Sequence, residues 1–85
     1  MQVVVVKFAD PTFYDLWDTL DEIDKSCYNY CYACGWLLEE NEKVVKVGAI
    51  VDEARHQGRS WVVIPAGCVR EVSVIKEVDW NRPGE

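Results

Sequence analysis

The residues with the most chemical potential in this chain are its four cysteines, Cys27, Cys31, Cys34 and Cys68. The first three have the spacing C-x3-C-x2-C, and thiolates so spaced can hold zinc or an iron–sulfur cluster. On a strand, Cys27 and Cys31 share one face while Cys34 points to the other. A helix would align all three, but the alternating tyrosines favour a strand. We therefore predict free thiols that behave as small hydrophobic groups, with zinc as the alternative.

Two further uses of the cysteines are disfavoured by the length and the start of the chain. The spacing also resembles the cluster motif of radical S-adenosylmethionine enzymes, but these enclose their cofactor in a large βα barrel, which 85 residues cannot supply. Disulfides are expected in secreted proteins, and Gln2–Phe8 has neither the charged start nor the cleavage site of a signal peptide. We expect no cofactor and a cytoplasmic location.

The single histidine, His56, is the obvious candidate for a general base. A nucleophile and its base must lie within about 3 Å of each other. His56 falls in a polar stretch between Arg55 and Gln57, with no cysteine or carboxylate at suitable spacing on a rigid element. The sequence also lacks a glycine-rich phosphate loop, a paired-carboxylate motif and a histidine-rich metal motif. We therefore predict that the protein is not an enzyme.

Basic and aromatic side chains point instead to the binding of an anion. Arginine holds phosphate with two parallel hydrogen bonds, and aromatic faces stack on bases. Because a small β-barrel has little room inside, a nucleotide-type ligand is expected at a boundary between subunits of a homo-oligomer. The alternative is that the arginines pair with Asp52, Glu53 and Glu71. The candidate ligand-binding residues are Arg55, His56, Arg59, Trp61, Arg70, Tyr30 and Tyr32.

The chain as a whole is acidic, with 15 Asp and Glu against 9 Lys and Arg and a net charge of -6. This balance argues against general nucleic-acid binding, which needs a basic patch. No apolar run approaches the roughly 18–20 residues that cross a bilayer, so no membrane partner is expected.

One amphipathic helix is predicted over residues 13–24, as a cover for the domain. Apolar residues recur there at spacings of three and four, namely Phe13, Leu16, Trp17, Leu20 and Ile23. Asp10 or Thr12 is the expected N-cap, with Pro11 at the first helical position. The polar face is either simply solvated or a protein-binding surface, whose candidate residues are Asp15, Asp18, Asp21 and Glu22.

The remaining segments predict a mainly β domain over residues 1–76, followed by a tail over 77–85. A charged loop is expected over 52–60, a tight turn at Pro65–Gly67, and a buried core that includes Trp36 and Ile64. One helix and five strands in this order predict a small SH3-like or Sm-like barrel. The predicted strands are Gln2–Phe8, Cys27–Glu40, Lys43–Val51, Trp61–Ile64 and Cys68–Ile75.

Two motifs resemble small proteins encoded by bacteriophages, over roughly residues 3–74. They are Gly35-Trp36-Leu37-Leu38-Glu39-Glu40 and Val63-Ile64-Pro65-Ala66-Gly67-Cys68-Val69. The resemblance implies an Sm-like barrel, residence in the cytoplasm of an infected bacterium, and no catalytic residues. Some small phage barrels act against host defence, either by gripping a defence protein or by taking up a nucleotide signal.

We therefore expect a phage-type binding protein that counters host defence by sequestering a small nucleotide-type signal between subunits. The first alternative is an inhibitor that binds a host defence complex through the acidic helix. The second is a structural or regulatory phage protein.

Overall fold

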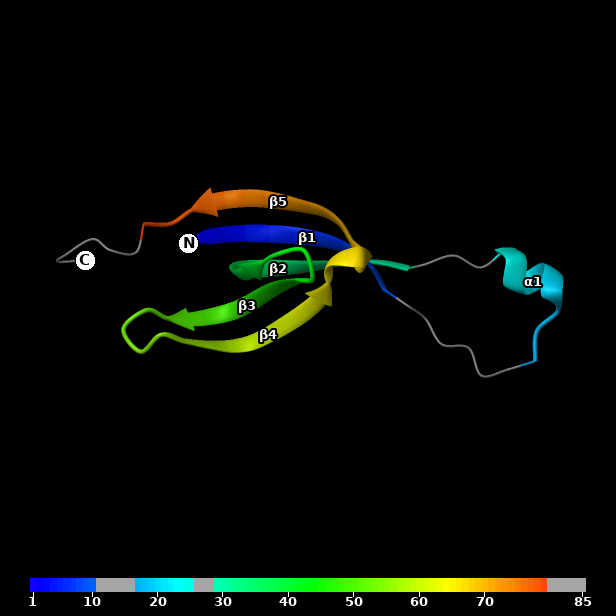
Figure 1. Ribbon diagram of the computed structural model, residues 1–85, viewed down its shortest axis with the longest axis horizontal. Helices are drawn as coiled ribbons and strands as arrows, with labels where there is room; N and C mark the ends of the chain where they lie inside the picture. The colour runs from blue at the N-terminus through cyan, green and yellow to red at the C-terminus, as the bar shows by residue number, and fades with distance from the viewer. Residues whose placement is uncertain (11–16, 26–28, 80–85) are drawn as a thin grey trace.

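The computed structural model describes residues 1–10, 17–25 and 29–79, which contain a single antiparallel sheet (Figure 1). The strands lie in the order β4-β3-β2-β1-β5. The mainly β fold predicted from the sequence is confirmed. The sheet is open, however, with β4 and β5 at its two edges, so the predicted closed barrel is not confirmed. The elements are β1 (Gln2–Asp10), α1 (Leu20–Lys25), β2 (Asn29–Glu40), β3 (Val44–Asp52), β4 (Gln57–Pro65), the 3-10 turn η1 (Ala66–Cys68) and β5 (Val69–Glu77).

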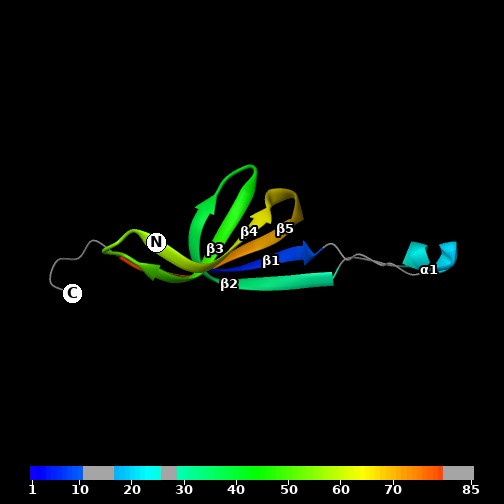
Figure 2. The ribbon, with the colours of Figure 1, turned by 90° about the horizontal axis from the view of Figure 1, so that it is seen from below.

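A sharp bend in β2 divides the sheet into two halves. β2 pairs with β1 as far as Trp36, and with β3 from Trp36 onward. A Cβ at Gly35 would overlap the backbone carbonyl of Gly48, and a Cβ at Gly48 would lie 2.9 Å from the Leu38 side chain. Glycine therefore allows the two strands to approach closely at the bend. Beyond it, the end of β2 and the start of β3 rise out of the plane of β1 (Figure 2).

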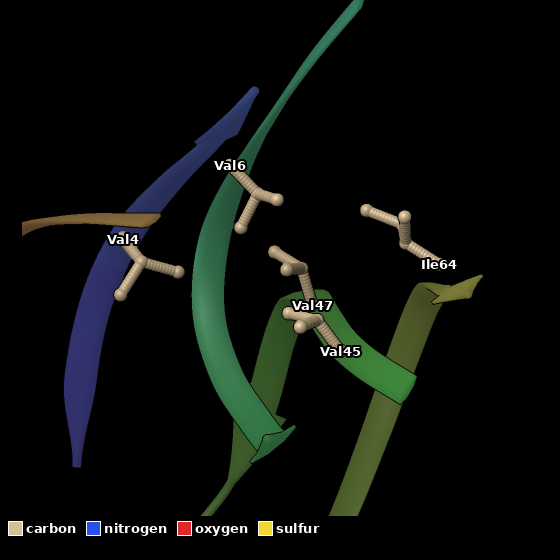
Figure 3. Packing of buried hydrophobic residues seen from close by; sticks show 5 residues of the cluster. All are labelled: Val4, Val6, Val45, Val47 and Ile64. Atoms are coloured by element: carbon tan, nitrogen blue, oxygen red, sulfur yellow. The ribbon is translucent and has the colours of Figure 1, made fainter. Parts of the chain in front are cut away.

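The bend produces a concave face that holds the core. Its fully buried side chains come from β1, β3 and β4 and point toward one another (Figure 3). Every second residue contributes, because side chains alternate between the two faces of a strand. Each core residue is at most 3% exposed, and together they are Val4, Val6, Val45, Val47 and Ile64.

One of the two predicted core residues is correct. Ile64 is 2% exposed, but Trp36 is only half-buried and does not belong to the core cluster. Its register partners are Val3 and Gly48, so it lies on the convex face of the sheet, opposite the core. The prediction for Trp36 was wrong because a single layer of sheet buries the large side chains of one face only.

The helix begins later than predicted. β1 continues to Asp10, so Asp10 ends a strand and does not cap the helix, and residues 17–19 are not helical. Pro11, Thr12 and residues 13–16 lie outside the described residues. The cap is Thr19, whose Oγ1 accepts a hydrogen bond from the Glu22 N–H at 3.2 Å. Thr19 and Glu22 have the spacing of a capping box, which indicates a helix that begins after Thr19. The prediction followed the spacing of the apolar residues instead and placed the start too early.

The helix does not cover the sheet as predicted. In both views α1 lies beyond the ends of β1 and β2, away from the core (Figures 1 and 2). Trp17, Leu20 and Ile23, expected to be its buried stripe, are 104%, 78% and 53% exposed. The molecule is accordingly elongated, with a radius of gyration of 17.2 Å against about 12 Å for a compact chain of this length.

The close crossing at the bend gives a test of the fold. Gly35→Ala is expected to lower the free energy of unfolding by about 3 kcal/mol, because the new methyl group meets the Gly48 carbonyl. Gly67→Ala is the matched control, since a Cβ there meets no atom within 4 Å. Urea unfolding of both variants measures the difference. Equal stability of the two variants would contradict the proposed role of Gly35.

Candidate functional site

A hollow of about 1270 Å³ lies at the end of the β3–β4 hairpin. Its walls are side chains from the ends of β2, β3 and β4 and from the turn that connects β3 to β4. Such a concave place with mixed apolar and polar walls is where a ligand site is first sought. Its lining is Met1, Leu38, Glu39, Lys46, Val51, Asp52, Glu53, Ala54, His56, Gln57, Gly58 and Trp61.

The apolar wall of the hollow depends on the glycine at the sheet bend. Trp61 is the register partner of Gly48, which has no side chain to stand beside the indole. The side chain of Leu38 lies over Gly48 and extends toward Gly58. Leu38 and Trp61 can therefore both line the same hollow.

The polar wall is the turn that connects β3 to β4. The Arg55 N–H donates to Asp52 Oδ1 at 3.1 Å, and the His56 N–H donates to the Glu53 carbonyl at 3.4 Å. His56 has a φ of 54°, a left-handed conformation that glycine usually adopts. The turn is thus held by its own hydrogen bonds, and it fixes the backbone from which His56 enters the hollow.

Most of the positive charge at the hollow is already paired. Lys46, the only lysine or arginine in the lining, has its Nζ 2.9 Å from Glu39 Oε1. Arg55 lies in the adjoining turn but outside the lining, and its Nε is 3.7 Å from Asp52 Oδ2. The lining also includes the carboxylate of Glu53. One copy of the chain therefore offers an anionic ligand no surplus of positive charge.

The structure brings only two of the predicted ligand-binding residues together, His56 and Trp61. Arg55 pairs with Asp52, which is the alternative expected for it. Arg59 belongs to β4 and not to the predicted loop, and it forms no ion pair with any residue that the structure describes. Ser60, with a φ of 55°, interrupts the regular strand between Arg59 and Trp61.

The other three predicted residues lie at the opposite end of the sheet. Tyr32 and Tyr30 pair with Lys7 and Ala9, and the Lys7 ammonium lies 4.7 Å from the centre of the Tyr30 ring. Trp36 marks the bend in β2, and the hollow lies beyond it. Tyr32 precedes Trp36 by four residues, or about 13 Å along a strand, and so lies away from the hollow. At the start of β5, the Arg70 guanidinium donates to the Gly67 carbonyl at 2.9 Å. These residues form no site with His56 within one copy.

The predicted acidic surface is placed on the segment that we call the α1 arm, residues 17–25. Asp18, Asp21 and Glu22 are all exposed there. Asp15 lies outside the described residues. Because the arm projects beyond the sheet, Asp18 and Asp21 are open to contact with another molecule.

The cysteines that the structure describes are free thiols on different faces of the sheet. Cys31 pairs with Phe8, a neighbour of the core, whereas Cys34 pairs with Val5 and is exposed. No three His, Cys, Asp or Glu side chains of the described residues are grouped as metal ligands. Cys27, the fourth member of the predicted zinc alternative, lies outside them.

Comparisons with known proteins identify no relative: no family model, curated protein or solved structure matches the chain. None of the helices described is long and apolar enough to cross a membrane.

Leu38 and Lys46 were missed as components of the hollow. A signal for Lys46 was present, because a hairpin with its tip at residues 41–43 places Lys46 close to Glu39. Nothing in the sequence indicated that Leu38 would lie over Gly48, since that depends on the irregular register between Leu37 and Glu39.

The thiols should differ in reactivity. Partial burial and the nearby Asp10 carboxylate, 3.7 Å from Sγ, raise the pKa of Cys31. At pH 8, iodoacetamide should therefore modify Cys34 before Cys31, because the thiolate is the reactive form. Asp10→Asn removes the carboxylate charge, so the pKa of Cys31 should fall and its modification should accelerate while that of Cys34 is unchanged. Peptide mass mapping over time gives both rates, and faster modification of Cys31 than of Cys34 in the unsubstituted chain would contradict the expectation.

Proposed function

We propose that this protein acts by binding another protein, as a phage-type inhibitor of a host defence complex, and that it has no catalytic function. The observation that carries the proposal is the exposed α1 arm, with the carboxylates of Asp18, Asp21 and Glu22. Such a cluster attracts a basic partner by long-range electrostatics. The phage resemblance of the two sequence motifs supports the defence context.

A second candidate function is the capture of a nucleotide-type ligand. It is favoured by the hollow shared by His56 and Trp61, where an aromatic face and a hydrogen-bonding ring are both available. The paired cations of the hollow mean that further positive charge would have to come from a second copy. This candidate therefore requires a homo-oligomer.

The two free sheet edges support such an assembly. Long edge strands with exposed apolar side chains invite pairing with another chain. Because every neighbouring pair in the sheet is antiparallel, β4 and β5 run in the same direction, and we propose that β4 of one copy pairs parallel with β5 of the next.

One register of this pairing matches both charge and face. Val62 then lies opposite Val74, and Arg59 lies opposite Glu71. Val62 and Val74 are 41% and 53% exposed, and their partners in the sheet are the core residues Val47 and Val4, so both belong to the concave face. The pairing continues the apolar face across the boundary and leaves one edge free for a further copy.

The two candidate functions make opposite predictions for two variants. If a protein is the ligand, Asp18→Asn combined with Asp21→Asn should slow association with the host defence protein about tenfold, while Trp61→Ala has little effect. If a nucleotide is the ligand, Trp61→Ala removes the aromatic face of the hollow and should weaken capture about tenfold, and the aspartate changes should not matter. Interferometry with purified host defence proteins, and calorimetry with cyclic and ADP-ribose-type nucleotides, give the two results. No binding in either assay would exclude both candidates.

The assembly has its own test in native mass spectrometry. Val62→Lys should reduce the mass to that of one 9.8 kDa chain, because a charge replaces an apolar contact at the edge. Adding Val74→Glu in the same chain should restore the oligomer, since every boundary then pairs Lys with Glu, whereas adding Val74→Lys should not. Two results would contradict β4–β5 pairing: an unsubstituted chain that is monomeric, or double variants with Val74→Glu and Val74→Lys that have the same mass.

A further inference from the structure

We propose that Trp17, Leu20 and Ile23 anchor the α1 arm in an apolar groove on the partner protein, and that lysines or arginines rim this groove. The inference rests on the proposed protein-binding function and goes beyond it, since the acidic residues alone were expected to make the surface. The carboxylates would attract the partner, and the three apolar side chains would hold it.

The exposure of these three side chains is the first support. Trp17 is fully exposed, and Leu20 and Ile23 are more than half exposed. These large apolar side chains therefore do not join the core of their own chain. Leu20 and Ile23 are one turn apart and therefore share a face of α1. Exposed aromatic and aliphatic anchors at this spacing are typical of helices that bind in grooves, and tryptophan is over-represented among residues that dominate binding energy.

The shortness of α1 is the second support. The helix has six residues, whereas isolated helices below about 12–15 residues are marginal in water. The Thr19 cap adds only a modest stabilisation. Most helical stability in proteins comes from packing of the apolar face, and here that face is open to solvent. A partner that covers Leu20 and Ile23 would supply the missing packing.

Charge identifies the kind of partner. The α1 arm has three more acidic than basic residues, and the whole chain has a net charge of -6, so the acidic surface of a second copy is a poor electrostatic match for the arm. The small apolar hollow beside η1, lined by Phe8 and Val62 among others, also includes Asp10 and suits the arm poorly. A basic rim around an apolar groove complements both the carboxylates and the three anchors.

The test begins with the full chain in its bacterial host, with a photo-reactive benzoylphenylalanine in place of Trp17. The protein that becomes cross-linked is identified, purified and titrated by calorimetry with the chain and its variants. Trp17→Ser, and Leu20→Ser combined with Ile23→Ser, should each weaken binding about 30-fold or more. Tyr32→Ser is the control, since Tyr32 is an exposed aromatic residue on the sheet, away from the arm, and it should change the affinity less than twofold.

A second measurement separates anchoring from a general effect on the fold. Amide hydrogens of residues 20–25 should exchange rapidly in the free chain and become protected in the complex, while β1 and β2 are protected in both. Replacing the lysines and arginines around the cross-linked groove on the partner should weaken binding by the same order as the serine variants.

Two results would overturn the inference. One is a partner that binds Trp17→Ser as tightly as the unsubstituted chain; if the aspartate variant then binds more weakly, the proposed function stands and the anchors do not. The other is a fall in the sedimentation mass of the chain alone on Trp17→Ser, which would make a second copy the occupant. If no protein is cross-linked and none of the purified defence proteins binds, the proposed function fails, and the inference fails with it.

Discussion

The rest of the structure depends on the close approach of two backbones at Gly35 and Gly48. Neither position accommodates a side chain. A Cβ at Gly35 would overlap the carbonyl group of Gly48, and a Cβ at Gly48 would press into the Leu38 side chain. This contact lets a single strand, β2, belong to both halves of the sheet. Without the bend the sheet would be flatter, and Val4 and Val6 of β1 could not meet Val47 of β3 in one core.

The same bend positions the hollow on the opposite face. The space left by the absent Gly48 side chain is filled by Leu38 and flanked by Trp61, and the β3–β4 turn then places His56 beside them. Core and hollow are therefore two consequences of one constraint, on the two faces of one layer. The sheet is open and therefore retains two free edges, and no second layer among the described residues covers its convex face.

The apolar stripe of the α1 arm is exposed, whereas such a stripe is usually buried. An apolar stripe on an acidic helix normally packs on the domain that it belongs to. Here it lies away from the sheet, and Trp17 and Leu20 are among the most exposed large side chains of the described residues. Carboxylates and apolar anchors together on one small projecting element are better suited to a second molecule than to the core of their own chain.

The sequence by itself determined the five strands and their order along the chain, the helix type near Leu20 and the alternation that separates Cys31 from Cys34. These follow from local propensity and from periods of two and 3.6 residues, which act over a few neighbours. The sequence did not determine that β4 begins at Gln57, inside the predicted loop over 52–60. Only the tertiary structure decided that Trp36 lies outside the core and that the apolar stripe of α1 is exposed. It also decided that His56 and Trp61 line one hollow, and that Tyr30 and Arg70 lie at the opposite end of the sheet. These depend on which strands become neighbours and on where β2 bends, and such contacts join residues far apart in sequence, about which a local pattern carries no information.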